Sequence, residues 1–193
     1  GGFCLRRFAG PEALEELLRR AADRGISLDE LLESGPPGLV SADLDERGRE
    51  VLRELIQEID GGLTLGFEAH PDQKQTKIYV LEGGCEIDSE DVLSASVQTD
   101  EQLGRPFVSI SFAEARALEQ LTRETTGEHL AIGFGPRVHS APLVREPIPG
   151  GALRLELGFE RQELDALLEA HVLVWQLIHP YPEGVTVEQL RVD

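Results

Sequence analysis

The sequence predicts an α+β fold, in which helices pack on one face of a mostly antiparallel sheet and a helical region precedes that sheet. Two observations support this fold class. Apolar residues recur at helical spacing before residue 60, and they alternate with polar residues after residue 62. Beyond that point, predicted strands are twice followed by a predicted helix. We therefore expect a helical N-terminal region at 1–60 and a main α+β domain at 61–193.

The N-terminal region is expected to hold three helices. The first runs from Pro11 to Gly25, since proline suits the first turn of a helix and glycine its end. Ser27 stands three residues before Glu30, a capping-box spacing that predicts a short second helix. A third helix is expected over 46–59, where valine, leucine and isoleucine share one face.

The main domain is expected to begin with a strand, because apolar and polar residues alternate over 63–67. Two helices are expected at 113–125 and 160–176, and Gly135-Pro136 has the composition of a hairpin turn. The other strands expected from the same alternation lie at 77–81, within 92–98, and at 107–112, 130–134, 138–144, 153–157 and 185–192.

Charge excludes some classes of partner. The net charge is -18 at pH 7, from 36 carboxylates against 18 lysines and arginines. Such a surface repels a phosphate backbone and an anionic lipid surface, so we expect no nucleic acid as a partner. No apolar run approaches the ~18 residues of a membrane span, so we expect no direct membrane insertion by this segment. Because the sequence lacks methionine even at position 1, we expect an excised or processed piece whose targeting or anchoring segment is not present.

The side chains that usually carry catalysis or bind metals show no recognisable pattern. The five histidines lack metal-ligand spacing, and no CxxC pair, G-x-S-x-G elbow or phosphate loop occurs. We therefore expect no catalytic residues, no metal and no cofactor, and the chain is not expected to be an enzyme. His171 is expected to be a helix residue near the core, and Trp175 with 172–174 is expected to pack as core.

The two cysteines, Cys4 and Cys85, leave two alternatives open. A disulfide between them would tie the N-terminus to the middle of the chain and would suit an oxidising compartment. Two unpaired thiols fit the sequence at least as well.

Four motifs give the sequence a family resemblance. Residues 104–109 read GRPFVS, 121–124 read LTRE, 130–132 read LAI and 140–151 read SAPLVREPIPGG. In this order and at these distances they resemble the head of the first periplasmic domain of the protein-export subunit SecD, over about residues 79–192. The chain departs from that family at its hairpin, which has Gly-Pro where the family usually has Asp-Gly.

The resemblance implies an extracytoplasmic, periplasmic or cell-surface location and a role in preprotein export. The implied activity is transient capture of an unfolded polypeptide emerging from the translocation channel. The implied partners are an unfolded preprotein or another protein, including translocon subunits. The alternative is a free-standing secreted or lipid-anchored protein-binding module that reuses the fold outside export.

The stretch from 140 to 151 is the predicted partner-binding surface. Its three prolines fix φ and lack N–H donors, so the stretch cannot be an interior strand throughout. We expect a stiff, extended edge or loop that meets a peptide by strand addition. The alternative is that Arg145 and Glu146 form a local ion pair that anchors the loop, while the prolines protect the edge. The residues expected to contact the partner are Ser140, Pro142, Arg145, Glu146, Pro147, Gly150 and Gly151.

Overall fold

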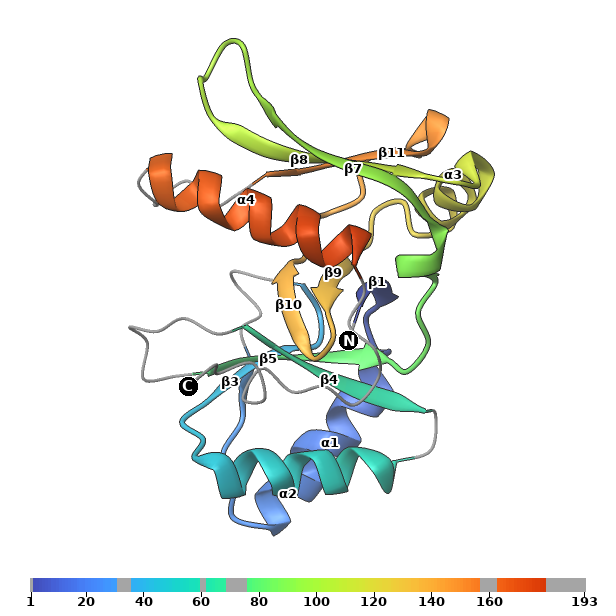
Figure 1. Ribbon diagram of the computed structural model, residues 1–193. Coiled ribbons are helices and arrows are strands. Elements are labelled where there is room, and N and C mark those ends of the chain that lie inside the picture. The colour runs from blue at the N-terminus through green and yellow to red at the C-terminus, as the bar shows by residue number, and fades with distance from the viewer. Residues whose placement is uncertain (1, 31–35, 60–61, 69–75, 157–162, 180–193) are drawn as a thin grey trace. The chain divides into compact units, whose positions relative to one another are not determined.

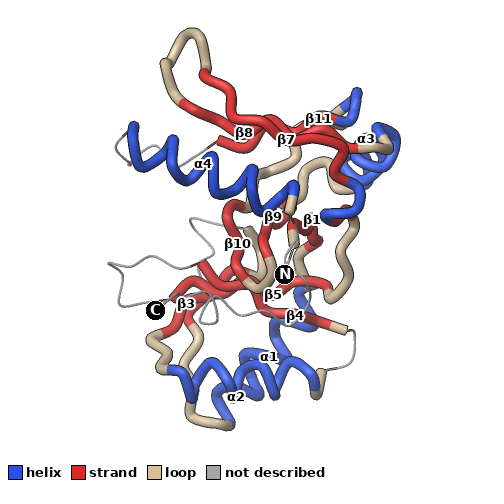
Figure 2. Tube along the Cα trace, in the orientation of Figure 1, coloured by secondary structure: helices blue, strands red, loops and turns tan. Residues whose placement is uncertain are grey.

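A computed structural model describes residues 2–30, 36–59, 62–68, 76–156 and 163–179 (Figure 1). The fold within these residues is α+β, with an eight-stranded sheet, a three-stranded sheet and four α-helices (Figure 2). The chain divides into two compact units. The eight-strand unit comprises Cys4–Ile87 and Glu124–Glu146, and the three-strand unit comprises Gly1–Phe3, Asp88–Arg123 and Pro147–Asp193.

The eight-strand unit is built on a mixed sheet of order β2-β3-β5-β4-β10-β9-β1-β6. β2 with β3, β3 with β5, β4 with β5 and β9 with β10 are antiparallel, whereas β10 runs parallel to β4. Its elements are β1 (Phe3–Arg7), α1 (Pro11–Asp23), β2 (Asp29–Glu30), β3 (Leu39–Ala42), α2 (Glu46–Gln57), β4 (Leu63–Glu68), β5 (Thr76–Glu82), β6 (Ile87–Asp88), β9 (Leu130–Phe134) and β10 (Arg137–Ser140).

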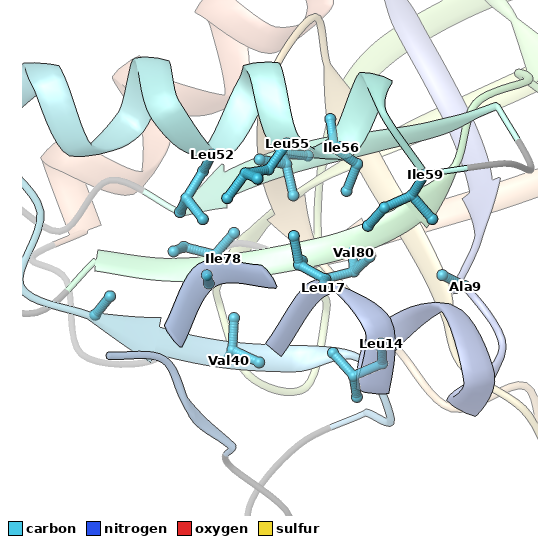
Figure 3. Close-up of a cluster of buried hydrophobic side chains, with 13 residues drawn as sticks. Ala9, Leu14, Leu17, Val40, Leu52, Leu55, Ile56, Ile59, Ile78 and Val80 are labelled. Atoms are coloured by element: carbon cyan, nitrogen blue, oxygen red, sulfur yellow. The ribbon is translucent and has the colours of Figure 1, made fainter. Parts of the chain in front are cut away.

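The core of this unit lies between α1, α2 and the sheet (Figure 3). Each helix places one apolar face inward because its leucines and isoleucines recur every three or four residues. α2 begins after Asp45, whose carboxylate accepts the N–H of Gly48 at 2.7 Å and caps the first turn. The buried side chains include Leu14, Leu17, Leu52, Leu55, Ile56, Val40, Ile78 and Val80.

The expectation of a helical N-terminal region is only partly right. The first and third predicted helices are α1 and α2, but β1, β2 and β3 also come from the first sixty residues. Ser27 and Glu30 do not start a helix: Asp29 and Glu30 pair with β3 instead, so sheet pairing outweighs the local capping signal. The two compact units also do not follow the expected boundary at residue 60.

The three-strand unit has an antiparallel sheet of order β11-β8-β7. Val108 and Ile110 are buried, whereas Ser109 and Ser111 on the opposite face are partly exposed, as the alternation predicts. Its elements are η1 (Ser89–Asp91), β7 (Val92–Thr99), β8 (Pro106–Phe112), α3 (Ala115–Glu124), η2 (Pro149–Gly151), β11 (Ala152–Glu156) and α4 (Glu163–Ile178). The predicted strand at 185–192 lies outside the described residues.

The expectation of a buried Trp175 is wrong. α4 packs on β7 and β8 through a row formed by Ala166, Ala170, Leu173 and Leu177, in which the two alanines allow close approach to the sheet. The opposite face therefore points away from the sheet, and Val172, Trp175 and His171 on it are exposed. Of the stretch 172–174, only Leu173 is buried.

Cys4 and Cys85 form a disulfide, with their Cα atoms 5.5 Å apart. The bond ties β1 to the loop before β6. Arg7 reinforces this region, because its guanidinium contacts the carboxylates of Glu124 at 2.7 Å and Glu86 at 2.9 Å. The hydrogen bond to Glu124, followed by the one to Glu86, raises the pKa of Arg7.

Candidate functional site

The candidate site is the proline segment, defined as residues 140–151. The division between the two compact units falls inside it, between Glu146 and Pro147. Residues 140–146 belong to the eight-strand unit, and residues 147–151 belong to the three-strand unit.

The first half of the proline segment is held along one side. The strand predicted for 138–144 ends at Ser140, where the register with β9 has shifted, and Pro142 then lacks the N–H that a regular ladder needs. The chain nevertheless continues antiparallel to 127–130. The bonds that hold it run from Leu130 N–H to the Pro142 carbonyl (3.1 Å), from Val144 N–H to the Glu128 carbonyl (2.8 Å) and from Gly127 N–H to the Val144 carbonyl (2.8 Å).

One buried side chain anchors this half, while its neighbours face solvent. Val144 is buried, whereas Pro142 and Leu143 before it are exposed. His129 adds a second anchor, because its Nδ1 donates to the carbonyl of Ala141 at 2.8 Å. The backbone is thereby fixed without covering the outward side chains.

Arg145 and Glu146 follow the anchor, and both are exposed. Neither forms an ion pair with any residue in the described ranges 2–30, 36–59, 62–68, 76–156 and 163–179. The alternative that these two residues pair to anchor the loop therefore has no contact to support it. Both charges remain available to a partner.

The second half of the proline segment is fastened to α3. The N–H of Ile148 donates to Thr122 Oγ1 at 2.8 Å, and the same hydroxyl donates to the carbonyl of Leu118 at 2.7 Å. Thr122 is almost completely buried, so this contact is shielded from water. The motif residue Thr122 thus holds the loop in place, a role that sequence reasoning did not assign.

The two glycines that end the segment have different surroundings. Both have positive φ, 80° at Gly150 and 65° at Gly151, which favours glycine. Gly150 is exposed, with nothing within 4 Å of where a Cβ would stand. Gly151 is buried, and a Cβ there would lie 2.6 Å from the Cα of Ala115. Pro147 is partly buried. Of the second half, Gly150 is therefore the more accessible of the predicted contact residues.

Other features of the described residues offer weaker candidates. An open depression of about 530 Å³ beside α1 and the end of α2 is lined by paired charges: Arg20 bridges Glu16 and Glu58. Hydrogen bonds from Arg19 and then Arg20 lower the pKa of Glu16 to about 2.

Within the part of the chain that the structure describes, no three histidine, cysteine or carboxylate side chains cluster in a way that could hold a metal ion. None of the helices described there has the length and apolar run needed to cross a membrane.

Comparison with known proteins gives consistent matches. Residues 67–173 match the family model described as "SecDF, P1 head subdomain". The protein translocase subunit SecD of Calditerrivibrio nitroreducens is 33% identical over 87 residues, which cover 44% of this chain and 17% of that protein. The protein translocase subunit SecDF of Thermus thermophilus is 27% identical over 144 residues, which cover 74% of this chain and 18% of that protein.

Solved structures give a weaker match. The structure described as that of a membrane component SecDF that enhances protein export has a TM-score of 0.44 and 18% identity, over 91% of this chain and 92% of that one. The chain spans less than a fifth of the length of the two translocase subunits described above.

Proposed function

The chain belongs to the SecDF P1 head subdomain family, and from that premise we propose that it is a non-catalytic, extracytoplasmic domain that binds unfolded polypeptide during protein export. The relatives are named as translocase subunits and are several times longer than this chain. The proposal therefore concerns only the role of the residues present in this chain. Its partners would be an unfolded preprotein or another protein, including subunits of the translocon.

The observation that carries the proposal is the arrangement of residues 142–146. Their backbone is hydrogen-bonded to 127–130 on one side, and Val144 is buried beneath it. Leu143, Arg145 and Glu146 are exposed. An extended segment held in this way can meet another extended chain through its backbone, because main-chain groups give affinity that depends little on sequence.

The exposed side chains suit a partner of variable sequence. Leu143 offers apolar surface, and Arg145 and Glu146 offer one charge of each sign. Contacts of this kind are individually weak, which fits a surface that must release its polypeptide as readily as it binds it.

The anchoring contacts also support a binding role. Because His129 and Val144 fix the first half and Thr122 fixes the second, little backbone entropy remains to be lost when a partner binds. The disulfide between Cys4 and Cys85 supports an extracytoplasmic location, since such bonds persist in oxidising compartments.

Fluorescence anisotropy tests the proposal. The ligand is a dye-labelled protein kept unfolded by reduction and carboxymethylation, and the dissociation constants of Leu143→Gln and Arg145→Ala are compared with that of the wild type. We expect each variant to weaken binding by about threefold to tenfold, as truncation of a contributing contact does.

Arg47→Ala is the matched control, because Arg47 is an exposed arginine on α2 of the same unit. Its affinity should equal that of the wild type. The proposal fails if both site variants bind as tightly as Arg47→Ala, or if the wild type binds no unfolded polypeptide at all.

A further inference from the structure

α4 has an exposed apolar face. Five of the eight large apolar side chains that are exposed among the described residues lie on this helix. They are Leu167 (38% exposed), Leu168 (59%), Val172 (54%), Trp175 (48%) and Ile178 (52%).

These side chains form one continuous surface. Leu168, Val172 and Trp175 follow one another at spacings of four and three residues, so they form a row along the helix. That row lies opposite the alanine and leucine row that packs on β7 and β8, and Leu167 and Ile178 lie along one edge of it. We call these five residues the α4 face.

A helix that is apolar on all sides is normally covered on all sides. From 166 to 179 the sequence contains a single charged residue, Glu169. The sheet covers one side of α4, so the sequence of this helix indicates that a second apolar surface covers the α4 face for part of the time.

The size of the α4 face argues against a stable dimer. Five partly exposed side chains offer on the order of a few hundred Å² of apolar surface, whereas a stable interface buries about 800 Å² on each partner. The net charge of -18 adds repulsion between two copies and between the chain and an anionic membrane. A small apolar surface on a strongly acidic chain fits a brief contact with a partner that is apolar and basic.

We propose that the α4 face binds an apolar segment of an unfolded polypeptide whose flanks carry basic residues. This inference rests on the proposed function, to which it adds a second surface and a preference for ligand chemistry. The α4 face would bind the apolar side chains of that segment. The negative net charge of the chain would attract the basic flanks.

Trp175 reports directly on this surface. It is the only tryptophan in the chain, and its ring stacks on that of His179 with the ring centres 5.5 Å apart. When a ligand covers the α4 face, water leaves the indole ring and its emission moves to shorter wavelength.

The experiment follows that emission during titration with a tryptophan-free peptide that has a leucine- and valine-rich centre and lysines at both ends. Two further peptides replace the lysines by glutamates or the apolar centre by serines. We expect a saturable shift with the first peptide, and binding about tenfold weaker or more with each of the others.

The variants are chosen to leave the fold intact. Leu168→Gln/Val172→Gln replaces two exposed side chains by a residue that favours helices, and we expect it to weaken binding by about tenfold. Leu103→Gln is the matched control, because Leu103 is 63% exposed in the same unit but outside α4. It should bind as the wild type does, and Leu168→Gln alone should lie between the two.

Other outcomes would overturn either the inference or the role proposed for the proline segment. If Leu168→Gln/Val172→Gln binds unfolded polypeptide normally while Arg145→Ala does not, the α4 face has no such role and the proposed function stands. If Arg145→Ala binds unfolded polypeptide normally while Leu168→Gln/Val172→Gln does not, the α4 face binds the polypeptide and the role of the proline segment fails. A shift that tracks protein concentration and dimer formation in sedimentation identifies a second copy as the occupant. A shift produced by vesicles of phosphatidylcholine and phosphatidylglycerol identifies a membrane instead.

Discussion

Alanine at Gly151 should be far more damaging than alanine at the adjacent Gly150. Both glycines have positive φ, 80° at Gly150 and 65° at Gly151, so each variant carries the cost of a left-handed backbone, about 1–2 kcal/mol. Part of that cost is offset, since alanine restricts the unfolded chain by about 0.4–1 kcal/mol. At Gly150 nothing else opposes the new methyl group, so its net cost should be about 1 kcal/mol.

Gly151 carries an additional steric cost. The new Cβ would lie 2.6 Å from the Cα of Ala115 and 2.8 Å from its Cβ, and neither atom belongs to a flexible side chain. Relief requires a shift of the backbone where α3 begins, which adds about 1–3 kcal/mol as overpacking does elsewhere. Gly151→Ala should therefore lose about 2–4 kcal/mol.

Urea unfolding followed by Trp175 fluorescence measures both variants. The two glycines and the single tryptophan belong to the same compact unit, so the signal reports on the part of the fold that the substitutions affect. The free energies of unfolding are compared at equal m-values. If Gly151→Ala loses no more stability than Gly150→Ala, the close packing of the proline segment on α3 is wrong.

Three further predictions concern contacts that lie within one or the other compact unit. Cys4→Ala/Cys85→Ala opens a loop with a sequence separation of 81 and should lower the free energy of unfolding by about 4–5 kcal/mol; reductant should have a similar effect on the wild type and none on the variant. Thr122→Val leaves the Ile148 N–H without its partner and should cost about 1–3 kcal/mol in urea unfolding, whereas Thr122→Ser, which keeps the hydroxyl, should cost less. The hydrogen bond from Arg154, followed by those from the N–H groups of Leu103 and Gln102, lowers the pKa of Asp100. The ionised carboxylate of Asp100 therefore stabilises the fold at neutral pH, and this contribution is lost as the pH falls through the lowered pKa. The stability difference between wild type and Asp100→Asn should therefore shrink with acidification below about pH 4, and a difference that grows there would contradict the assigned contacts.

A strand of the main domain could be predicted from alternation where one face is buried and the other is not. β8 alternates buried and partly exposed residues, and its apolar residues other than Phe107 share one face, so the pattern is visible in the chain itself. β3 is different: all four of its residues are buried, and a strand covered on both faces shows no alternation. β1 was not predicted either, because it has only five residues and ends in two charged ones, Arg6 and Arg7.

The candidate site was predicted in part. The prolines indicated that the segment could not be an interior strand throughout, since a missing N–H is a local property. The strand predicted over 138–144 was nevertheless too long, because β10 ends at Ser140. The anchors at Thr122 and His129 depend on residues 26 and 12 positions away, and such contacts require the three-dimensional fold. The pairing of Cys4 with Cys85 was undecidable for the same reason. The resemblance read from four motifs was confirmed, because the family match at 67–173 covers all four of them and the chain between them.

The exposed side of α4 was missed because burial was inferred from residue type alone. Trp175 and Val172 belong to classes that usually lie inside a protein, yet the two alanines of the opposite face made the closer contact with the sheet.

Mapping the binding of an unfolded polypeptide onto the backbone amides by NMR tests the central claim most directly. We predict saturable shifts at Leu143, Arg145 and Glu146 when a reduced, carboxymethylated protein is titrated into the isotope-labelled chain. If those three amides stay unchanged while the polypeptide demonstrably binds, the proline segment is not the recognition surface.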